Sequence, residues 1–256
     1  MTYSMPVTQK LKKMIKSLYQ KQYREQNGLF VVEGDKMVSE LLNSQNDIEL
    51  VVVRESPSSL AMALLEKLSE LAVPIYNAPK HVFDQMCDAK SPQSILAVTN
   101  LVESELNLNE SFIALNGVSD PGNVGTIIRS ADWFGFRQVI LDKDCADKFN
   151  PKVLRSTMGS IFRVQVIQTD DLFNMLKNNF SQTMLFSADT NADYLLKSFR
   201  TKKNIGLIMG SEAHGISEEL ETLINKKFRI EGFGNAESLN VAVAAGISMY
   251  HFANIK

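Results

Sequence analysis

The chain of 256 residues is 45% hydrophobic and 22% charged, with a net charge of −2, which is typical of a globular protein of one or two domains. Its apolar runs are too short to cross a bilayer and its N-terminus lacks the apolar block of a secretory signal, so we expect no membrane partner and a cytoplasmic location. Cys87 and Cys145 lie far apart without histidine clusters, which predicts a reducing compartment and no metal site.

The first predicted element is a helix whose apolar residues recur at helical spacing, at Leu11, Met14, Ile15 and Leu18. Basic residues of the segment 1–30 lie mostly off that stripe, at Lys10, Lys12, Lys13, Lys16, Lys21 and Arg24. Such a basic face can bind phosphates by releasing counterions, and a solvated helix face is the alternative.

Strands and helices then alternate along the rest of the first half. We predict strands at 29–33, 49–53, 73–77 and 95–100, with helices at 36–42, 57–71 and 79–86. The segment 103–111 is polar with little periodicity, and we place a domain boundary there, between domains 1–103 and 104–256. The first domain is therefore expected to be a small α/β unit.

The second half repeats this alternation. Predicted strands lie at 112–116, 138–141, 163–167, 183–187, 205–209 and 227–230, and predicted helices at 124–134, 151–157, 171–178, 217–223 and 239–252. This order predicts a second α/β domain with a mostly parallel sheet.

Residues 116–129, NGVSDPGNVGTIIR, follow a predicted strand and open a helix. The turn residues 120–123 predict Asn123 as the N-cap, and a helix N-terminus attracts anions. Arg129 lies two turns inside the helix, where its guanidinium could reach a phosphate. A capped turn with a surface arginine is the alternative, and the segment matches neither phosphate-loop fingerprint.

Residues 207–217, LIMGSEAHGIS, run from an apolar strand into a loop with two glycines. Gly210 would let the backbone approach a ligand closely, and Glu212 lies at the strand end where ligands bind in open α/β sheets. An ordinary loop capped by Ser217 is the alternative, and we interpret His214 as a loop residue rather than an acid or base.

Residues 230–246, IEGFGNAESLNVAVAAG, join a glycine-rich loop to a helix that is apolar nearly all round, which predicts burial of that helix. Ser238 is a possible N-cap of this helix. Asn240 near its start would be costly to bury unless its amide is hydrogen-bonded, which indicates a site there.

In this order the three stretches resemble the three signature motifs of the SpoU (TrmH-like) class of SPOUT RNA methyltransferases. Motif one corresponds to Asn123 with Arg129, motif two to Met209, Gly210 and Glu212, and motif three to Glu237, Ser238, Leu239 and Asn240. The resemblance covers residues 108–256. One departure is Glu231, where the family usually has proline, which puts the rigidity and charge of that loop in doubt.

The first half resembles the substrate-binding domain that often precedes this catalytic domain, which is similar in fold to small RNA-binding ribosomal proteins. The similarity rests on residues 21–25, on 28–34 with Glu33 and Gly34, and on 91–93. It implies that this domain selects the RNA and favours an RNA contact for the opening basic helix.

The resemblance implies a deep trefoil knot, a homodimer and S-adenosyl-L-methionine (AdoMet) as cofactor, and no metal. Met209, Gly210, Ile230, Ser238 and Leu239 would hold the cofactor. Motif one of the partner subunit would complete the site, and the helix from Leu239 would be buried in the knot and the dimer interface.

The implied reaction is methyl transfer to a ribose 2′-hydroxyl of RNA, with ribosomal RNA favoured over transfer RNA. Because a guanidinium stays charged near neutral pH, we expect Arg129 to clamp a phosphate and stabilise the developing alkoxide rather than act as the base. Asn123, Glu212, Ser238 and Asn240 would orient the ribose and Arg129. The alternatives are a base methyltransferase of the same superfamily, a non-catalytic RNA-binding assembly factor of the same fold, and a generic nucleotide-binding α/β protein.

Overall fold

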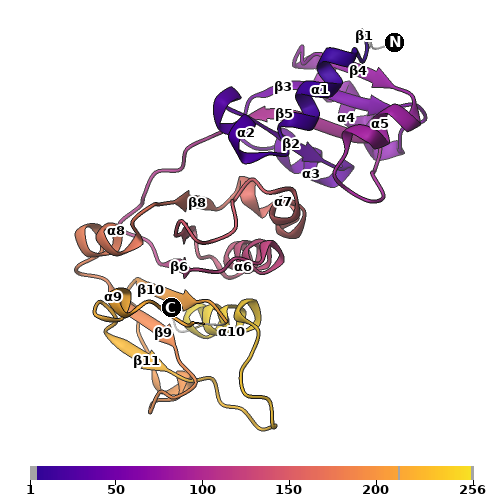
Figure 1. Ribbon diagram of the computed structural model, residues 1–256. Coiled ribbons are helices and arrows are strands. Elements are labelled where there is room, and N and C mark those ends of the chain that lie inside the picture. The colour runs from indigo at the N-terminus through magenta and orange to yellow at the C-terminus, as the bar shows by residue number, and fades with distance from the viewer. Residues whose placement is uncertain (1–4, 213, 255–256) are drawn as a thin grey trace. The chain divides into compact units, whose positions relative to one another are not determined.

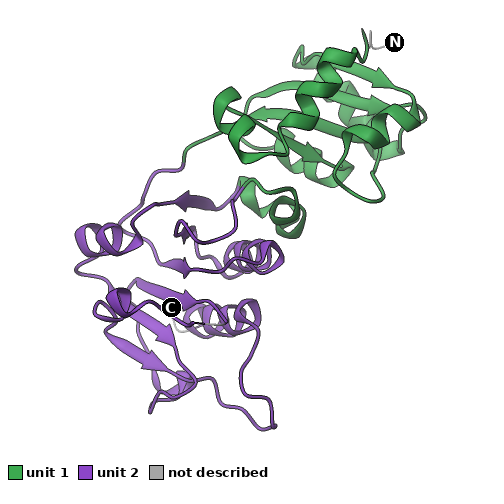
Figure 2. Ribbon diagram, viewed as in Figure 1, with its two compact units in different colours: residues 1–103, 149–162 green, residues 104–148, 163–256 purple. Residues whose placement is uncertain are grey.

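The computed structural model describes residues 5–212 and 214–254, and the chain divides into two compact units (Figures 1 and 2). Unit 1 contains the chain up to Glu103 together with residues 149–162, and unit 2 contains 104–148 and the chain from Arg163 onward. The return of 149–162 to unit 1 was not predicted from the sequence. The functional domain limits, 1–103 and 104–256, stay predictions.

Unit 1 is built on a five-stranded sheet in the order β1 (Met5–Pro6), β4 (Ile75–Ala78), β3 (Ile48–Arg54), β5 (Ile95–Asn100) and β2 (Leu29–Glu33). Its β5 runs antiparallel to both neighbours, whereas the β1–β4 and β4–β3 pairs are parallel. The helices are α1 (Gln9–Ser17), α2 (Lys21–Asn27), α3 (Asp35–Leu42), α4 (Ser59–Glu70) and α5 (Lys80–Met86).

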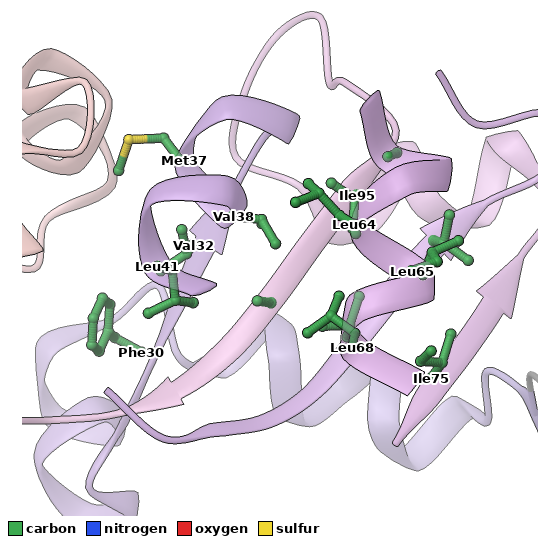
Figure 3. Close-up of a cluster of buried hydrophobic side chains, with 14 of the residues drawn as sticks. Phe30, Val32, Met37, Val38, Leu41, Leu64, Leu65, Leu68, Ile75 and Ile95 are labelled. Carbon is green, nitrogen blue, oxygen red and sulfur yellow. The ribbon is translucent and has the colours of Figure 1, made fainter. Parts of the chain in front are cut away.

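Helices pack against both faces of this sheet. Successive side chains of a strand point to opposite sides, so one strand contributes to two cores. Phe30 and Val32 of β2 join the core under α3 and α4 (Figure 3), whereas Val31 joins the core under α1 and α5. Leu154 of α7 (Pro151–Thr157) is buried in the first of these cores, and the Phe149 ring lies 4.5 Å from that of Phe30. This packing explains why 149–162, which ends in the short helix η1 (Ser160–Phe162), belongs to unit 1.

Unit 2 contains a six-stranded, all-parallel sheet, which confirms the predicted α/β fold. Its order is β11 (Lys226–Phe228), β9 (Met184–Ala188), β10 (Ile205–Gly210), β6 (Phe112–Asn116), β7 (Gln138–Leu141) and β8 (Gln165–Gln168). One face packs against α8 (Leu172–Asn179) and residues near α9 (Glu218–Glu221). The helices α6 (Pro121–Phe134) and α10 (Val241–Ala253) pack against each other, and η2 (Leu196–Ser198) lies near α10.

The start of α6 differs from the prediction. Asp120 is the N-cap, and its carboxylate accepts a hydrogen bond of 3.0 Å from the backbone N–H of Asn123. Proline suits the first helical turn because its fixed φ matches the helix and its missing N–H needs no partner. Pro121 therefore places the cap one residue before itself, and the prediction of Asn123 as the cap was wrong.

Helix α10 is buried on part of its surface in the single chain, and its predicted burial in a dimer interface stays a prediction. The helix begins at Val241 with Asn240 as its N-cap rather than Ser238, and it exposes a stripe of apolar side chains. This stripe, called the α10 stripe below, consists of Val243, Ile247 and Tyr250 of the helix and Leu239 just before it, which are 39% to 58% exposed. No helix among the described residues is long and apolar enough to cross a membrane.

Candidate functional site

Side chains from all three motifs meet at the C-terminal edge of the unit 2 sheet. Asn123 Nδ2 and Asn240 Nδ2 both donate to Glu212 Oε1, over 3.1 and 3.0 Å, and Asn240 Nδ2 also lies 3.0 Å from Asn123 Oδ1. We call these residues the polar triangle. They belong to one chain, so the meeting of Asn123 with motifs two and three requires no partner subunit.

The head of α10 holds the triangle in place. Asn240 Oδ1 accepts hydrogen bonds from the N–H groups of Ala242 (3.0 Å) and Val243 (3.4 Å). Glu212 Oε1 also accepts from the N–H of Val241 at 3.4 Å. Asn240 thus uses one end of its amide to cap the helix and the other to bind the triangle; the amide is hydrogen-bonded as predicted, but the residue is exposed rather than buried.

A cavity of about 770 Å³ lies beside the triangle, between the ends of β9 and β10 and the loop 229–239. This volume falls in the usual range for small-molecule sites. The residues assigned to cofactor binding all line it, together with Glu212; they are Met209, Gly210, Ile230, Ser238 and Leu239. Ser238 lines the cavity without joining the triangle.

Gly210 is required by the loop that follows it. Ser211 and Gly215 exchange two backbone hydrogen bonds of 3.0 and 2.9 Å, which folds the motif-two loop back on itself. A Cβ added to Gly210 would lie 2.1 Å from the carbonyl carbon of Gly215. The glycine therefore permits this close approach of backbone to backbone. Glu212, two residues later, joins the polar triangle.

The charged wall of the cavity includes Lys227, whose ammonium donates to Glu221 at 2.8 Å and to Asp189 at 3.3 Å. The hydrogen bond with Glu221 raises the pKa of Lys227. Glu231, at the position where the family usually has proline, accepts a 2.6 Å hydrogen bond from Lys197. The departure thus replaces a rigid ring by an exposed ion pair.

Arg129 does not reach the polar triangle. Its side chain is exposed on α6, it does not line the cavity, and it has no hydrogen bond or ion pair with any residue that the structure describes. Thr126 and Trp133 lie on the same face of α6 by their helical spacing, and Trp133 is 83% exposed. Arg129 is therefore presented outward beside a large aromatic side chain.

The α10 stripe lies on the helix that packs against α6. The rings of Tyr250 and Phe134 are in edge contact, with centroids 5.8 Å apart, and they link α10 to α6. A run of exposed apolar side chains of this kind on packed helices marks an interaction surface.

Asp142 and Asn116 lie at the base of the motif loops, and the sequence reasoning did not single out either as a site residue. Asp142 directly follows the buried strand β7, and an acidic residue at that point of a parallel sheet was the signal available in the sequence. Burial raises the pKa of the nearby Cys145 thiol to about 12, with a further contribution from Asp142.

The signature residues of unit 1 are structural. Arg24, which was counted in the basic patch, is 4% exposed and donates to the carbonyls of Leu18 and Tyr19 at 3.1 and 2.9 Å. Glu33 accepts from the Tyr19 hydroxyl at 2.7 Å and from the N–H of Asp88 at 2.8 Å. Burial, followed by the charge of Glu33, raises the pKa of Tyr19. Arg24 is thus unavailable to a phosphate.

The remaining basic residues of α1 are more accessible. Lys10, Lys13 and Lys16 are exposed, whereas the ammonium of Lys12 donates to Gln85 of α5. No group of three or more metal-ligating side chains is found among the described residues.

Comparison with known proteins places these residues in a family. Residues 110–250 match the model of the SpoU rRNA Methylase family, and residues 9–97 match that of the MRM3-like substrate binding domain. The chain is 32% identical to the 23S rRNA (guanosine(2553)-2′-O)-methyltransferase RlmP of Bacillus subtilis, over 92% of this chain and 93% of that protein.

Two solved structures share the fold over nearly the whole chain. A TrmH-family structure from Porphyromonas gingivalis has a TM-score of 0.83 at 30% identity and covers 96% of this chain and 98% of its own. An AdoMet-bound rRNA methyltransferase from Sinorhizobium meliloti has a TM-score of 0.83 at 26% identity, with 96% and 95% covered. With its three motifs gathered around one cavity, the chain belongs to the SpoU rRNA methylase family.

Proposed function

We propose that this protein transfers a methyl group from AdoMet to a ribose 2′-hydroxyl of ribosomal RNA. The observation that carries the proposal is the polar triangle, in which one residue from each family motif joins a hydrogen-bonded cluster whose Glu212 lines a cavity of about 770 Å³. The 23S rRNA 2′-O-methyltransferase RlmP, similar over almost the whole chain, supports the substrate class.

The cavity fits the cofactor in size and in polarity. Ser187, at the end of β9, lines it, and its buried hydroxyl has no hydrogen-bond partner among the described residues. A buried hydroxyl without a partner is costly, so it favours a ligand with polar atoms at this wall. When bound, AdoMet supplies an electrophilic methyl group on its sulfonium.

The residues of this chain then mainly align and stabilise. Asn123, Glu212 and Asn240 orient the ribose at the rim, and Ser238 reaches it from the cavity wall. Arg129 clamps a neighbouring phosphate and stabilises the alkoxide that develops as the 2′-hydroxyl loses its proton. Met209, Gly210, Ile230 and Leu239 hold the cofactor.

A second copy of the chain completes the site. Arg129 and Trp133 face outward on α6, and the α10 stripe leaves apolar area exposed on the helix that packs against α6. Pairing of these helices in a homodimer buries that area and brings Arg129 of one subunit to the cavity of the other. The loops 211–217 and 229–240, which border one cavity, are the segments that would form the trefoil knot.

Unit 1 selects the RNA. Lys10, Lys13 and Lys16 form an exposed basic row on α1 that suits phosphate contacts, in keeping with the match to a substrate binding domain. We place both the activity and its ribosomal RNA substrate in the cytoplasm.

The test is transfer of labelled methyl groups from AdoMet to ribosomal and transfer RNA, followed by digestion to nucleosides. The expected product is a 2′-O-methylnucleoside from ribosomal RNA. A base-methylated product would overturn the chemistry, and label in transfer RNA alone would overturn the substrate class. Absence of label together with no heat in a calorimetric titration with AdoMet would indicate an RNA-binding factor without activity.

A further inference from the structure

The carboxylate of Asp142 gathers four N–H groups at the end of β7. Its Oδ2 accepts from Asn116 Nδ2 at 2.5 Å and from the N–H of Gly117 at 2.9 Å. Its Oδ1 accepts from the N–H groups of Asp144 at 3.0 Å and Cys145 at 2.9 Å. Because Asp142 is only 5% exposed, these protein donors replace water as its partners.

Asn116 extends this cluster to the motif-two loop. It is the last residue of β6, and its Oδ1 accepts a hydrogen bond of 2.8 Å from the N–H of Ser217, the N-cap of α9. Gly117, which opens the motif-one loop, lies against Ser211 of the motif-two loop, since a Cβ added there would sit 3.6 Å from Ser211 Cβ. Asp142 and Asn116 together therefore tie the loops that follow β6, β7 and β10.

These loops carry two corners of the polar triangle. Asn123 lies six residues beyond Gly117, and Glu212 lies five residues before Ser217, while neither Asp142 nor Asn116 lines the cavity. We propose that Asp142 and Asn116 are a positioning pair that sets the motif-one loop against the motif-two loop and so fixes Asn123 beside Glu212. This inference rests on the proposed methyltransferase function.

Position 142 requires a side chain whose two terminal atoms both accept hydrogen bonds. Every orientation of an asparagine amide there would turn an NH₂ group toward two N–H donors. If Asn116 rotated its own amide to accept from that NH₂, its Nδ2 would face the N–H of Ser217. Asp142→Asn must therefore break contacts at the motif-one loop, the motif-two loop or the β7 loop.

The experiment compares Asp142→Asn, Asn116→Asp, their double variant and the control Asp144→Asn, which removes an exposed carboxylate two residues away. In each single pair variant we expect kcat for methyl transfer to fall by about 10- to 100-fold through misplacement of the reacting groups. Calorimetric Kd for AdoMet should change by less than about twofold, because neither substituted residue lines the cavity. The control should keep wild-type kcat.

The double variant gives the sharper readout. The new carboxylate at position 116 can accept both from the amide at position 142 and from the N–H of Ser217, so part of kcat should return. A folded Asp142→Asn protein with wild-type kcat would overturn the pair. The pair would also be overturned if kcat, AdoMet affinity and Tm all fell together and the double variant recovered none of the lost kcat. That outcome would indicate a structural role alone.

A crystal structure of the Asp142→Asn variant tests the pair independently of activity. The pair predicts that the distance from Asn123 Nδ2 to Glu212 Oε1, 3.1 Å here, lengthens beyond hydrogen-bond reach. An unchanged distance would overturn it. If the wild-type protein were inactive, the proposed function and the catalytic role of the pair would both be overturned. The distance between Asn123 and Glu212 would still decide whether the pair positions the residues of the polar triangle.

Discussion

The signature residues of the two units differ in what surrounds them. In unit 1, the signature residues Arg24 and Glu33, and Asp35 directly after the signature, are bonded to backbone and to hydroxyl groups of the same unit, and Arg24 and Asp35 are buried. In unit 2, Glu212 and Asn240 are exposed beside a cavity, and Arg129 is free of described partners. Both sets are polar residues, and the second set lies beside a cavity that could hold a ligand.

This difference separates motifs that build a fold from motifs that perform chemistry. Asp35 shows the first kind: its carboxylate accepts from Ser94 N–H at 3.1 Å and from the hydroxyl of Ser58, the N-cap of α4. Its loss should therefore lower stability and leave the chemistry intact. The loss of Arg129 should instead lower the rate of methyl transfer and leave stability intact.

The largest effect is expected for Arg129→Ala. If Arg129 stabilises the transition state as proposed, removal of its charge should lower kcat by about 100- to 1,000-fold. Tm and AdoMet affinity should stay at wild-type values, because the side chain is exposed and outside the cavity. Radiolabel transfer, thermal denaturation and calorimetry provide the three measurements. Arg137→Ala, an exposed arginine just beyond α6, is the control and should stay active; near-normal activity of Arg129→Ala would remove it from the mechanism.

The next effect is on the stability of unit 1. Asp35→Ala leaves Ser94 and the α4 cap without their buried acceptor, and we expect a loss of about 3 kcal/mol in the free energy of unfolding. Urea denaturation measures it, and kcat per folded molecule should be unchanged. Glu49→Ala, an exposed carboxylate on β3, is the control. A loss of kcat in fully folded Asp35→Ala would contradict an architectural role.

Ile247→Glu places a charge in the middle of the α10 stripe, where the side chain is 39% exposed in one chain. If this stripe is the dimer interface, the dimer dissociation constant should rise by about 30-fold or more. Analytical ultracentrifugation across a concentration series measures this constant. Met62→Glu on α4, another exposed apolar position, should leave the association unchanged. A dimer that resists Ile247→Glu would place the interface elsewhere.

A smaller effect is expected for charge reversal of the α1 row, Lys13→Glu with Lys16→Glu. For each lysine that binds a phosphate, its reversal should reduce the slope of log K against log salt by about 0.7 to 0.9, and RNA affinity should fall by about 10-fold at low salt. Filter binding at several salt concentrations measures both quantities. Lys67→Glu on the exposed face of α4 is the control. An unchanged salt slope would identify the α1 row as a solvated helix face.

The smallest effect is expected for Glu231→Gln. The Lys197–Glu231 pair is exposed, at 62% and 39%, and exposed ion pairs contribute little. AdoMet affinity, measured by calorimetry, should therefore change by no more than about twofold. Lys197→Met should give the same small change in affinity. A tenfold loss in Glu231→Gln alone would mean that its carboxylate contacts the ligand.

Much of this arrangement was predictable, because repeated local patterns encode it. Apolar spacing located most strands and helices within about three residues, and the three motifs identified part of the cavity lining and all of the triangle. The cap of α6 was misplaced because Asn123 and Asp120 are both good caps, and only the position of Pro121 decides between them.

Other features depend on contacts between residues distant in the sequence. The burial of Arg24 requires the chain to turn so that the carbonyls of Leu18 and Tyr19 face it, and no local pattern shows this. The return of 149–162 to unit 1 depends on the packing of Phe149 and Leu154 against its core. The position of Asp142 after a buried strand is visible in the sequence, but the four donors that meet at its carboxylate come from the folded loops.

The most direct test is a map of 2′-O-methyl groups in ribosomal RNA from cells with and without this protein. The deletion strain is complemented with wild-type protein or with Arg129→Ala. We predict that deletion removes methylation at one or a few ribose positions, and that wild-type protein but not Arg129→Ala restores it. Identical maps with and without the protein, or full restoration by Arg129→Ala, would contradict ribose methylation by the exposed residues of unit 2.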